Sequence, residues 1–290
     1  MSKLTLTKYL AKIERRVPLS PPAREAFLSM PAESQDFAAY RDVIKEGDRP
    51  HLASFVESGL VSRYQTLRGG ERQIMSFHIA GDLVDLQSAL VVIADHGVRT
   101  HCATRIVTVA HADVLRAAAN YPELGRAFWF DTLSDAAIFR EWTINLGRRK
   151  SHERTAHLIL EMAALYERAG LAEDDTFEFP ITQSDLSDAL GMTAIHLNRV
   201  LQSLRRDRLI RTHARSITIE NRAALTALAG FDPRYLHPEG MRESNDFGGH
   251  LERNAPEGTP QSNDLDGRFE RCVRGSDRSV RDERGISGAT

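Results

Sequence analysis

Residues 182–210, TQSDLSDALGMTAIHLNRVLQSLRRDRLI, contain two short amphipathic segments separated by Gly-Met-Thr. Thr182 can accept a hydrogen bond at the start of the first segment, and Asp185 three positions later completes a Thr-x-x-Asp capping box. Gly191 stands where the end of a helix requires a left-handed residue, and Thr193 can cap the second segment. A short glycine-containing turn between two capped helices predicts a helix-turn-helix.

The second helix has two chemically different faces when it is projected at about 100° per residue. Its apolar positions follow an i, i+3, i+4, i+7 pattern and should face a core: Leu197, Val200, Leu201 and Leu204. The opposite face carries Ile195, Arg199, Gln202 and Arg206, with His196, Asn198 and Ser203 at the flanks. We therefore expect one face to be buried and the other to remain free.

The free face has side chains that can read base edges in a DNA major groove. Arginine can donate two hydrogen bonds to guanine, asparagine or glutamine can pair with adenine, and isoleucine can contact a thymine methyl group. Thr182, Gln183 and Ser184, at the exposed start of the first helix, suit phosphate oxygens. The alternative is a solvated polar face on an ordinary helical hairpin. The turn, the caps and the arginine-bearing face together favour DNA binding.

The rest of the chain divides into segments that differ in the spacing of their apolar residues. Residues 1–36 look helical, with a Pro-Pro break at 21–22. From about 37 to 113, short runs rich in Val, Ile, Phe and Thr alternate with glycine turns, which predicts a small antiparallel sandwich or barrel. A long helix follows that is apolar on more than one side. We expect one side to lie on the barrel and the other on a partner, the alternative being burial within one domain.

The sequence FPITQSDLSDALGMTAIHLNRVLQSLRRDRLI resembles the winged helix-turn-helix of the Crp–Fnr family of bacterial transcription regulators. A looser resemblance extends over about residues 20–235. It implies an α+β fold with an N-terminal antiparallel β-barrel of the jelly-roll, cyclic-nucleotide-binding type, a long dimerisation helix and a C-terminal winged helix-turn-helix. The corresponding domains are residues 1–120, including the N-terminal helices, 121–147 and 148–237. Residues 238–290 have too few apolar side chains to fold, so they are predicted to form a disordered tail.

The resemblance also implies how the chain acts. Members of the family are homodimers that place two recognition helices in successive major grooves of a palindromic double-stranded DNA operator, and activators contact RNA polymerase. Arg199 matches the base-reading arginine of the family. Ala194 and Ile195 match other base-contacting positions but lack the polar groups often found there. The expected DNA-binding residues are Thr182, Gln183, Ser184, Thr193, Ala194, Ile195, His196, Asn198, Arg199, Gln202 and Arg206.

The segment GDLVDLQSAL at 81–90 occupies the place of the phosphate-binding cassette of the family. Asp85-Leu86 stands where a nucleotide-binding member would have Gly-Glu. Arg99 and Thr100 could form the phosphate pair, but their spacing fits poorly, and Arg99 also fits a surface position on a strand. We retain Asp85, Arg99 and Thr100 as candidate ligand residues and do not predict a cyclic nucleotide as the signal.

Composition narrows the remaining possibilities. Two cysteines, Cys102 and Cys272, are too few for an iron–sulfur cluster, so we expect none. The histidines of the barrel region lack dense ligand spacing, and no metal site or other cofactor is expected. The net charge of −2 requires any basic DNA footprint to be local. No apolar run reaches the roughly 18 residues of a membrane span, and no secretory leader is evident, so we expect a cytoplasmic protein without membrane contact.

The sequence therefore predicts a transcription regulator and not an enzyme. Two other functions remain as alternatives: a cupin-like metal-dependent enzyme with an accessory helical domain, and a ligand-binding module whose helix-turn-helix no longer binds DNA.

Overall fold

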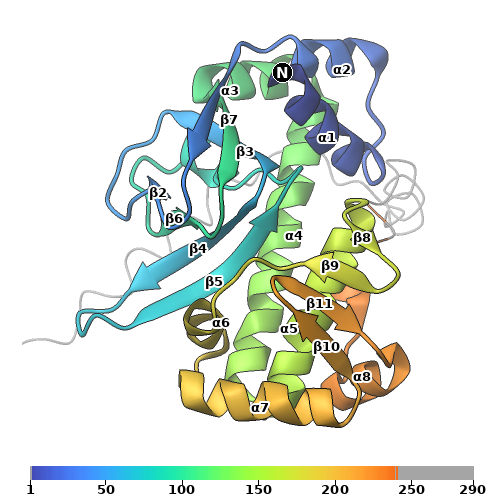
Figure 1. Ribbon diagram of the computed structural model, residues 1–290. Coiled ribbons are helices and arrows are strands. Elements are labelled where there is room, and N and C mark those ends of the chain that lie inside the picture. The colour runs from blue at the N-terminus through green and yellow to red at the C-terminus, as the bar shows by residue number, and fades with distance from the viewer. Residues whose placement is uncertain (1, 239, 241–290) are drawn as a thin grey trace, which may run out of the picture. The chain divides into compact units, whose positions relative to one another are not determined.

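Two antiparallel β-sheets face each other in the N-terminal part of the chain, as a computed structural model that describes residues 2–238 and 240 shows (Figure 1). The first sheet has the order β1-β7-β3, with bounds Ala32–Phe37, Thr104–Ala110 and Leu52–Ser58. The second has the order β2-β6-β4-β5, with bounds Asp42–Ile44, Gly97–Thr100, Leu60–Thr66 and Arg72–Ile79. The apolar side chains between the sheets are Ile44, Val56, Val61, Val84, Val98 and Ile106. The predicted α+β fold and jelly-roll sandwich are confirmed, although the two sheets do not close into one ring.

A tight turn at Gly59 passes the chain from the first sheet to the second. Its φ is +99°, a conformation that favours glycine. A Cβ atom at this position would lie 2.9 Å from the carbonyl oxygen of Ala103. Because that neighbour is backbone, a larger residue would force the turn and the strands it joins to move.

Helices cover the outer face of the first sheet. They are α1 (Ser2–Glu14), α2 (Pro21–Leu28), α3 (His111–Asn120) and the start of α4 (Pro122–Gly147). Tyr9 of α1, Phe27 of α2 and Phe55 of β3 are fully buried, and the Tyr9 ring lies 5.6 Å from that of Phe27 and 5.1 Å from that of Phe55. Pro122 occupies the first turn of α4, where its missing N–H removes no helical hydrogen bond.

The sequence-based expectation that residues 1–36 are helical is wrong at its end. Ala32–Phe37 form strand β1, which pairs antiparallel with β7 at the edge of the first sheet. The four central side chains of β1 are all exposed, so its sequence, AESQDF, shows no alternation of apolar and polar residues. Backbone pairing with β7 decides the conformation here, and that partner lies about seventy residues further along the chain.

The C-terminal part contains four helices and a small sheet. The helices are α5 (Ser151–Arg168), α6 (Gln183–Leu190), α7 (Ala194–Arg206) and α8 (Arg222–Ala229), followed by the short 3₁₀ turn η2 (Pro233–Leu236). The sheet has the order β10-β11-β9-β8, with bounds Ile210–His213, Ser216–Ile219, Thr176–Glu178 and Ala172–Glu173. Strands β10 and β11 form an antiparallel hairpin whose turn contains Ala214, with a φ of +51°.

One apolar cluster joins the two parts of the described chain. The ring of Phe77, on β5, lies 6.0 Å from that of Trp142 on α4 and 5.2 Å from that of Phe179, which follows β9. The cluster continues into α5 and the buried face of α7. The second sheet, the long helix and the helix-turn-helix therefore share a single core.

A buried carboxylate lies where α4, α5 and η2 meet. Glu161 of α5 accepts hydrogen bonds from Trp142 Nε1 at 2.8 Å and from Tyr235 Oη at 2.5 Å. Burial raises the pKa of Glu161 to about 7, and these hydrogen bonds offset the effect only in part.

We expect this carboxylate to lower the stability of the fold as the pH rises from acidic to neutral values. In the unfolded chain Glu161 ionises near pH 4.3, so the folded state holds the extra proton between that value and about 7. Stability from this group is therefore lost as the pH rises through this window. Glu161→Gln should therefore stabilise the protein more at pH 8 than at pH 5. The gain in free energy of unfolding over the native protein should be larger at pH 8 by about 2 to 3 kcal/mol. Urea titrations at both pH values measure this, and Glu33→Gln, at an exposed position, is the control. An equal effect of Glu161→Gln at the two pH values would contradict the assignment.

Candidate DNA interface

Local hydrogen bonds fix the turn between α6 and α7. Thr182 Oγ1 accepts from the N–H of Asp185 at 3.1 Å, and Thr193 Oγ1 accepts from the N–H of His196 at 3.2 Å. Gly191 ends α6 in the left-handed conformation, with a φ of +57°. The two N-caps and the glycine turn are therefore those that the sequence predicts, whereas the reciprocal contact of the capping box is a hydrogen bond from Thr182 Oγ1 to the Asp185 carboxylate.

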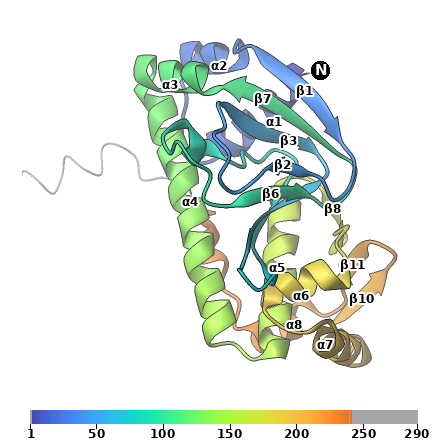
Figure 2. The ribbon, with the colours of Figure 1, turned by 90° about the vertical axis from the view of Figure 1, so that its left-hand side faces the viewer.

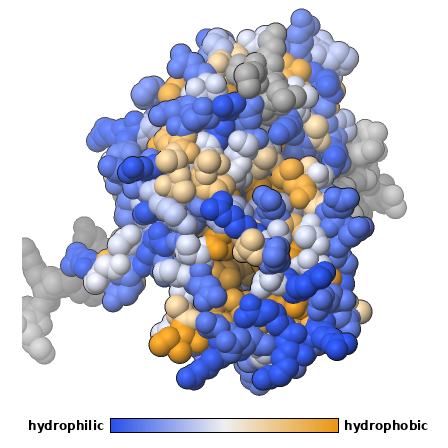
Figure 3. Space-filling model, viewed as in Figure 1, coloured by the Kyte–Doolittle hydropathy of each residue, from blue (hydrophilic) through white to orange (hydrophobic). Residues whose placement is uncertain are grey.

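The two faces of α7 are separated as expected. Its inward side chains are all buried: Leu197, Val200, Leu201 and Leu204. On the opposite face Arg199, Gln202 and Arg206 are exposed, and Ile195 is 71% exposed. Figure 3 shows a mostly hydrophilic surface over α7, with a small apolar patch at one end. The helix has a free, mostly polar face because its leucines and Val200 are buried on the other side, whereas Ile195 stays exposed.

The remaining predicted contact residues lie around the same surface. Those that are exposed are Thr182, Gln183, Ser184, Thr193, Ala194 and His196, whereas Asn198 is half-buried. Arg206 donates to Ser203 Oγ at 3.1 Å. No hydrogen bond or ion pair holds the Arg199 guanidinium to any residue that the structure describes, so this group is available to a ligand.

The carboxylate of Asp185 has one partner that the sequence indicated, Thr182, and two that it did not, Arg72 and His101. It accepts from Thr182 Oγ1 at 2.5 Å and forms an ion pair with Arg72 of β5, which also bonds Asp188 at 2.8 Å. His101 Nδ1 lies 3.5 Å from the same carboxylate. Burial opposes ionisation of Asp185, but the hydrogen bonds and the charges of His101 and Arg72 lower its pKa overall. The polar network thus attaches α6 to the second sheet.

The three candidate ligand residues of the N-terminal part do not converge. Asp85 is buried and accepts from the N–H of Ser54 at 2.7 Å, and burial raises its pKa to about 6. Asp85 lines a cavity of about 10 Å³, which Arg99 and Thr100 do not line. Thr100 Oγ1 donates to the carbonyl oxygen of Ala38 at 2.8 Å. The Arg99 guanidinium lies 6.0 Å from the ring of Tyr40.

Comparisons with known proteins agree with this arrangement. Residues 153–228 match the Crp-like helix-turn-helix domain family. The transcriptional activator FnrL of Cereibacter sphaeroides is 26% identical over 205 residues, which cover 68% of this chain and 81% of FnrL. The fumarate and nitrate reduction regulatory protein of Yersinia pestis is 25% identical, with 65% and 75% covered. The chain thus carries a Crp-like helix-turn-helix domain and is similar to these transcription regulators over about two thirds of its length.

A solved structure shows the same fold. The structure of FixK2 from Bradyrhizobium japonicum superposes with a TM-score of 0.65 at 24% identity and covers 70% of this chain and all of FixK2. The curated relatives are regulators and not enzymes, and they give no support to the alternative of a cupin-like enzyme. Within the described part of the chain, no helix is both long and apolar enough to cross a bilayer.

The separation of faces on α7 predicts that replacing two of its apolar residues by alanine has very unequal effects on stability. Leu197→Ala should lower the free energy of unfolding by about 2–5 kcal/mol because it leaves a cavity in the core. Ile195→Ala, on the exposed face, should change it by no more than about 0.5 kcal/mol. Urea denaturation followed by circular dichroism compares the two variants with the native protein. Similar losses for both would show that the outward face is not free.

Proposed function

We propose that the protein is a homodimeric, sequence-specific regulator that places the outward face of α7 in the major groove of double-stranded DNA. The observation that carries this proposal is the exposed and unpaired guanidinium of Arg199, set on a helix whose opposite side is fully buried. An arginine in this state can donate two parallel hydrogen bonds to guanine. Exposed Gln183 and Ser184, beside the start of α6, suit phosphate contacts that set the register.

Replacement of Arg199 tests direct base reading. An operator is first selected from random duplexes by the native protein. Arg199→Ala should then lose about 1–3 kcal/mol of affinity for that operator and relax the preference at one position, with little loss on unrelated DNA. Fluorescence anisotropy at one fixed salt concentration measures both affinities. Arg116→Ala, an exposed arginine on α3, should bind as the native protein does. Unchanged affinity and unchanged preference in Arg199→Ala would refute direct reading by this residue.

The homodimer is supported by an apolar stripe on α4. Trp129 is 68% exposed, and Leu133 and Ile144 follow on the same side of the helix, with half-buried Ala136 and exposed Arg140 between them. Figure 2 shows α4 at the outer edge of the ribbon, with the N-terminal sheets on its inner side. A second apolar group, residues 90–93, is also exposed and follows η1 (Leu86–Ala89), which contacts α4. Two such surfaces on neighbouring elements suit a second copy of the chain, packed helix against helix.

A charge in this stripe should separate the subunits. Leu133→Glu places a carboxylate where the partner helix would pack, so the dissociation constant of the dimer should rise by at least about tenfold. Light scattering coupled to size exclusion at micromolar concentration reports the mass. Leu115→Glu is the matched control, because Leu115 is 41% exposed on α3 and Leu133 is 47% exposed on α4. Equal masses for the two variants, or a native protein with the mass of one chain, would contradict the proposed interface.

The regulatory cycle completes the proposal. A signal received by the N-terminal part would shift the populations of two arrangements of α4 near Gly147 and so reorient α7 on a palindromic operator. The proposed dimer would work in the cytoplasm and contact RNA polymerase. We propose that the signal is not a cyclic nucleotide and that the protein does not use an iron–sulfur cluster to sense it. Asp85-Leu86 in place of Gly-Glu, the small cavity beside Asp85 and the two cysteines of the chain support this view.

A further inference from the structure

A second and much larger cavity lies where α1, the end of β5 and the end of α5 meet. Its volume is about 450 Å³, within the range of roughly 300–1,000 Å³ that is usual for small-molecule sites. The apolar part of its lining comes from all three elements: Ala11, Ile79, Ala80, Leu165, Ala169 and Leu171. Such a lining suits the hydrocarbon or aromatic body of a ligand.

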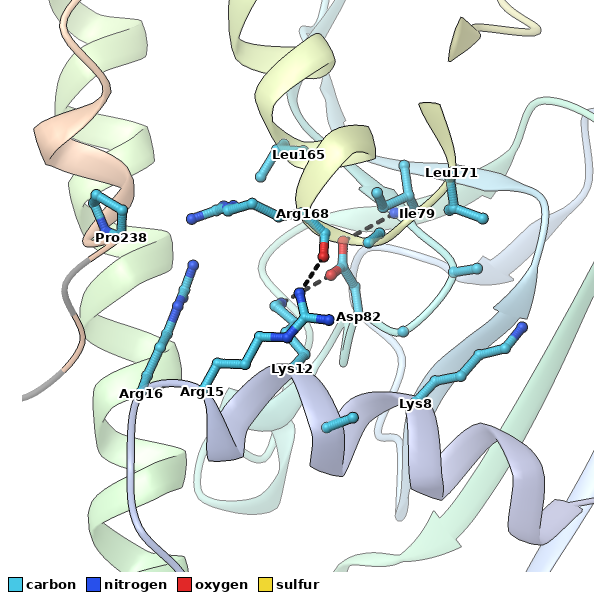
Figure 4. Close-up of a pocket in the computed structure, with 14 residues that line it drawn as sticks. Lys8, Lys12, Arg15, Arg16, Ile79, Asp82, Leu165, Arg168, Leu171 and Pro238 are labelled. Atoms are coloured by element: carbon cyan, nitrogen blue, oxygen red, sulfur yellow. Dashed lines mark hydrogen bonds and ion pairs between the residues drawn. The ribbon is translucent and has the colours of Figure 1, made fainter. Parts of the chain in front are cut away.

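The charged part of the lining is mostly basic (Figure 4). The one carboxylate among the lining residues that the structure describes is Asp82, and it pairs with Lys12 at 2.8 Å. Arg15 donates to the carbonyl oxygen of Arg168. Arg16 and Arg168 therefore have no carboxylate of the lining left to pair with.

These two arginines share a single neutral acceptor. Arg16 Nη2 and Arg168 Nη1 donate to the same carbonyl oxygen, that of Leu236, at 3.2 and 3.0 Å. Figure 4 shows both side chains extending toward the same side of the pocket, next to Pro238. Arg168 Nε is buried and has no hydrogen-bond partner among the described residues. Burial, and next the nearby charge of Arg16, lower the pKa of Arg168 to about 10. Two partly buried cations held this way leave a position for an anion.

We propose that this pocket binds a small amphipathic oxyanion, a carboxylate or a phosphate monoester on an apolar body, with the charged group held by Arg16 and Arg168. Guanidinium groups match the geometry of both anions, because two N–H groups can bond two oxygens at once. The apolar lining holds the body of the ligand. α1 and β5 belong to the sensor part and α5 begins the DNA-binding part, so the ligand contacts both. Its role as a signal rests on the proposed function, whereas its binding does not.

Binding to the full-length protein without DNA tests the site. Octanoate and phenyl phosphate are the probes, inorganic phosphate lacks the apolar body, and octylammonium reverses the charge. Isothermal titration calorimetry should show one site per chain for at least one of the two amphipathic anions. Its affinity should fall about tenfold or more in Arg168→Gln and in Arg16→Gln. Arg116→Gln, on α3, should bind as the native protein does.

A pocket-filling variant tests the site even if the arginine variants do not fold. Ala11 is exposed at the wall of the pocket, so Ala11→Trp should block binding and leave the thermal unfolding midpoint unchanged. No binding of either amphipathic anion to the native protein would overturn the proposal. So would equal binding of inorganic phosphate or octylammonium, or undiminished binding in Ala11→Trp.

The regulatory role has its own measurement. A saturating concentration of the bound anion should change the affinity for the selected operator by about fivefold or more in the native protein and leave it unchanged in Ala11→Trp. Binding without any effect on the operator would overturn the regulatory role. Loss of operator binding in all conditions would instead count against the proposed function, since the calorimetric result does not depend on DNA.

Discussion

The packing of Phe77 connects the second sheet, the long helix and the DNA-binding part. Its ring contacts Trp142 of the long helix and Phe179 of the DNA-binding part, while its backbone belongs to the second sheet. Well-packed cores respond to a displaced side chain by shifting between discrete arrangements and not by smooth deformation. A single core runs from the sheet to α7, so packed side chains connect β5 with the helix-turn-helix without interruption. This geometry is what a regulator needs if a distant event is to change the position of α7.

Polar contacts around this core add a second kind of connection. Arg72 of β5 reaches Asp185 and Asp188 of α6, and Gln73 Nε2 donates to the carbonyl oxygen of Ala189 at 3.3 Å. Asp185 is also part of the turn at the start of α6, where Thr182 donates to it. One carboxylate therefore serves both the local structure of the helix-turn-helix and its attachment to the sheet. Apolar packing supplies most of the cohesion, whereas these directional bonds fix how α6 is oriented on the sheet.

The sequence predicted α6 and α7 well because the signals for them are local. Caps, a left-handed glycine and a helical repeat of leucines all lie within thirty residues. It could not predict Arg72 or His101 as partners of Asp185, because those contacts join positions more than eighty residues apart. Strand β1 was not predicted for the same reason. Its pairing with β7, and not its own pattern of apolar and polar residues, makes it a strand. The exposed face of α4 is an intermediate case. The helix was predicted to be apolar on several sides, but only the fold shows that Trp129 and Leu133 remain uncovered while Ala137 is buried.

The distribution of empty space bears on where a signal can enter. Between the two sheets the interior is filled by aliphatic side chains, and the cavity beside Asp85 is no larger than about one water molecule. A larger space, of about 450 Å³, lies where α1 and β5 face the end of α5. A ligand between the sheets would have to act on α7 through the sheet and the long helix. A ligand at the junction would contact α5, the first helix of the DNA-binding part, directly. If this ligand binds one of two arrangements of α5 more tightly, it shifts their populations without an intermediate element. The shorter route requires fewer intervening contacts to change, and it begins at two arginines that share one neutral acceptor, the carbonyl oxygen of Leu236.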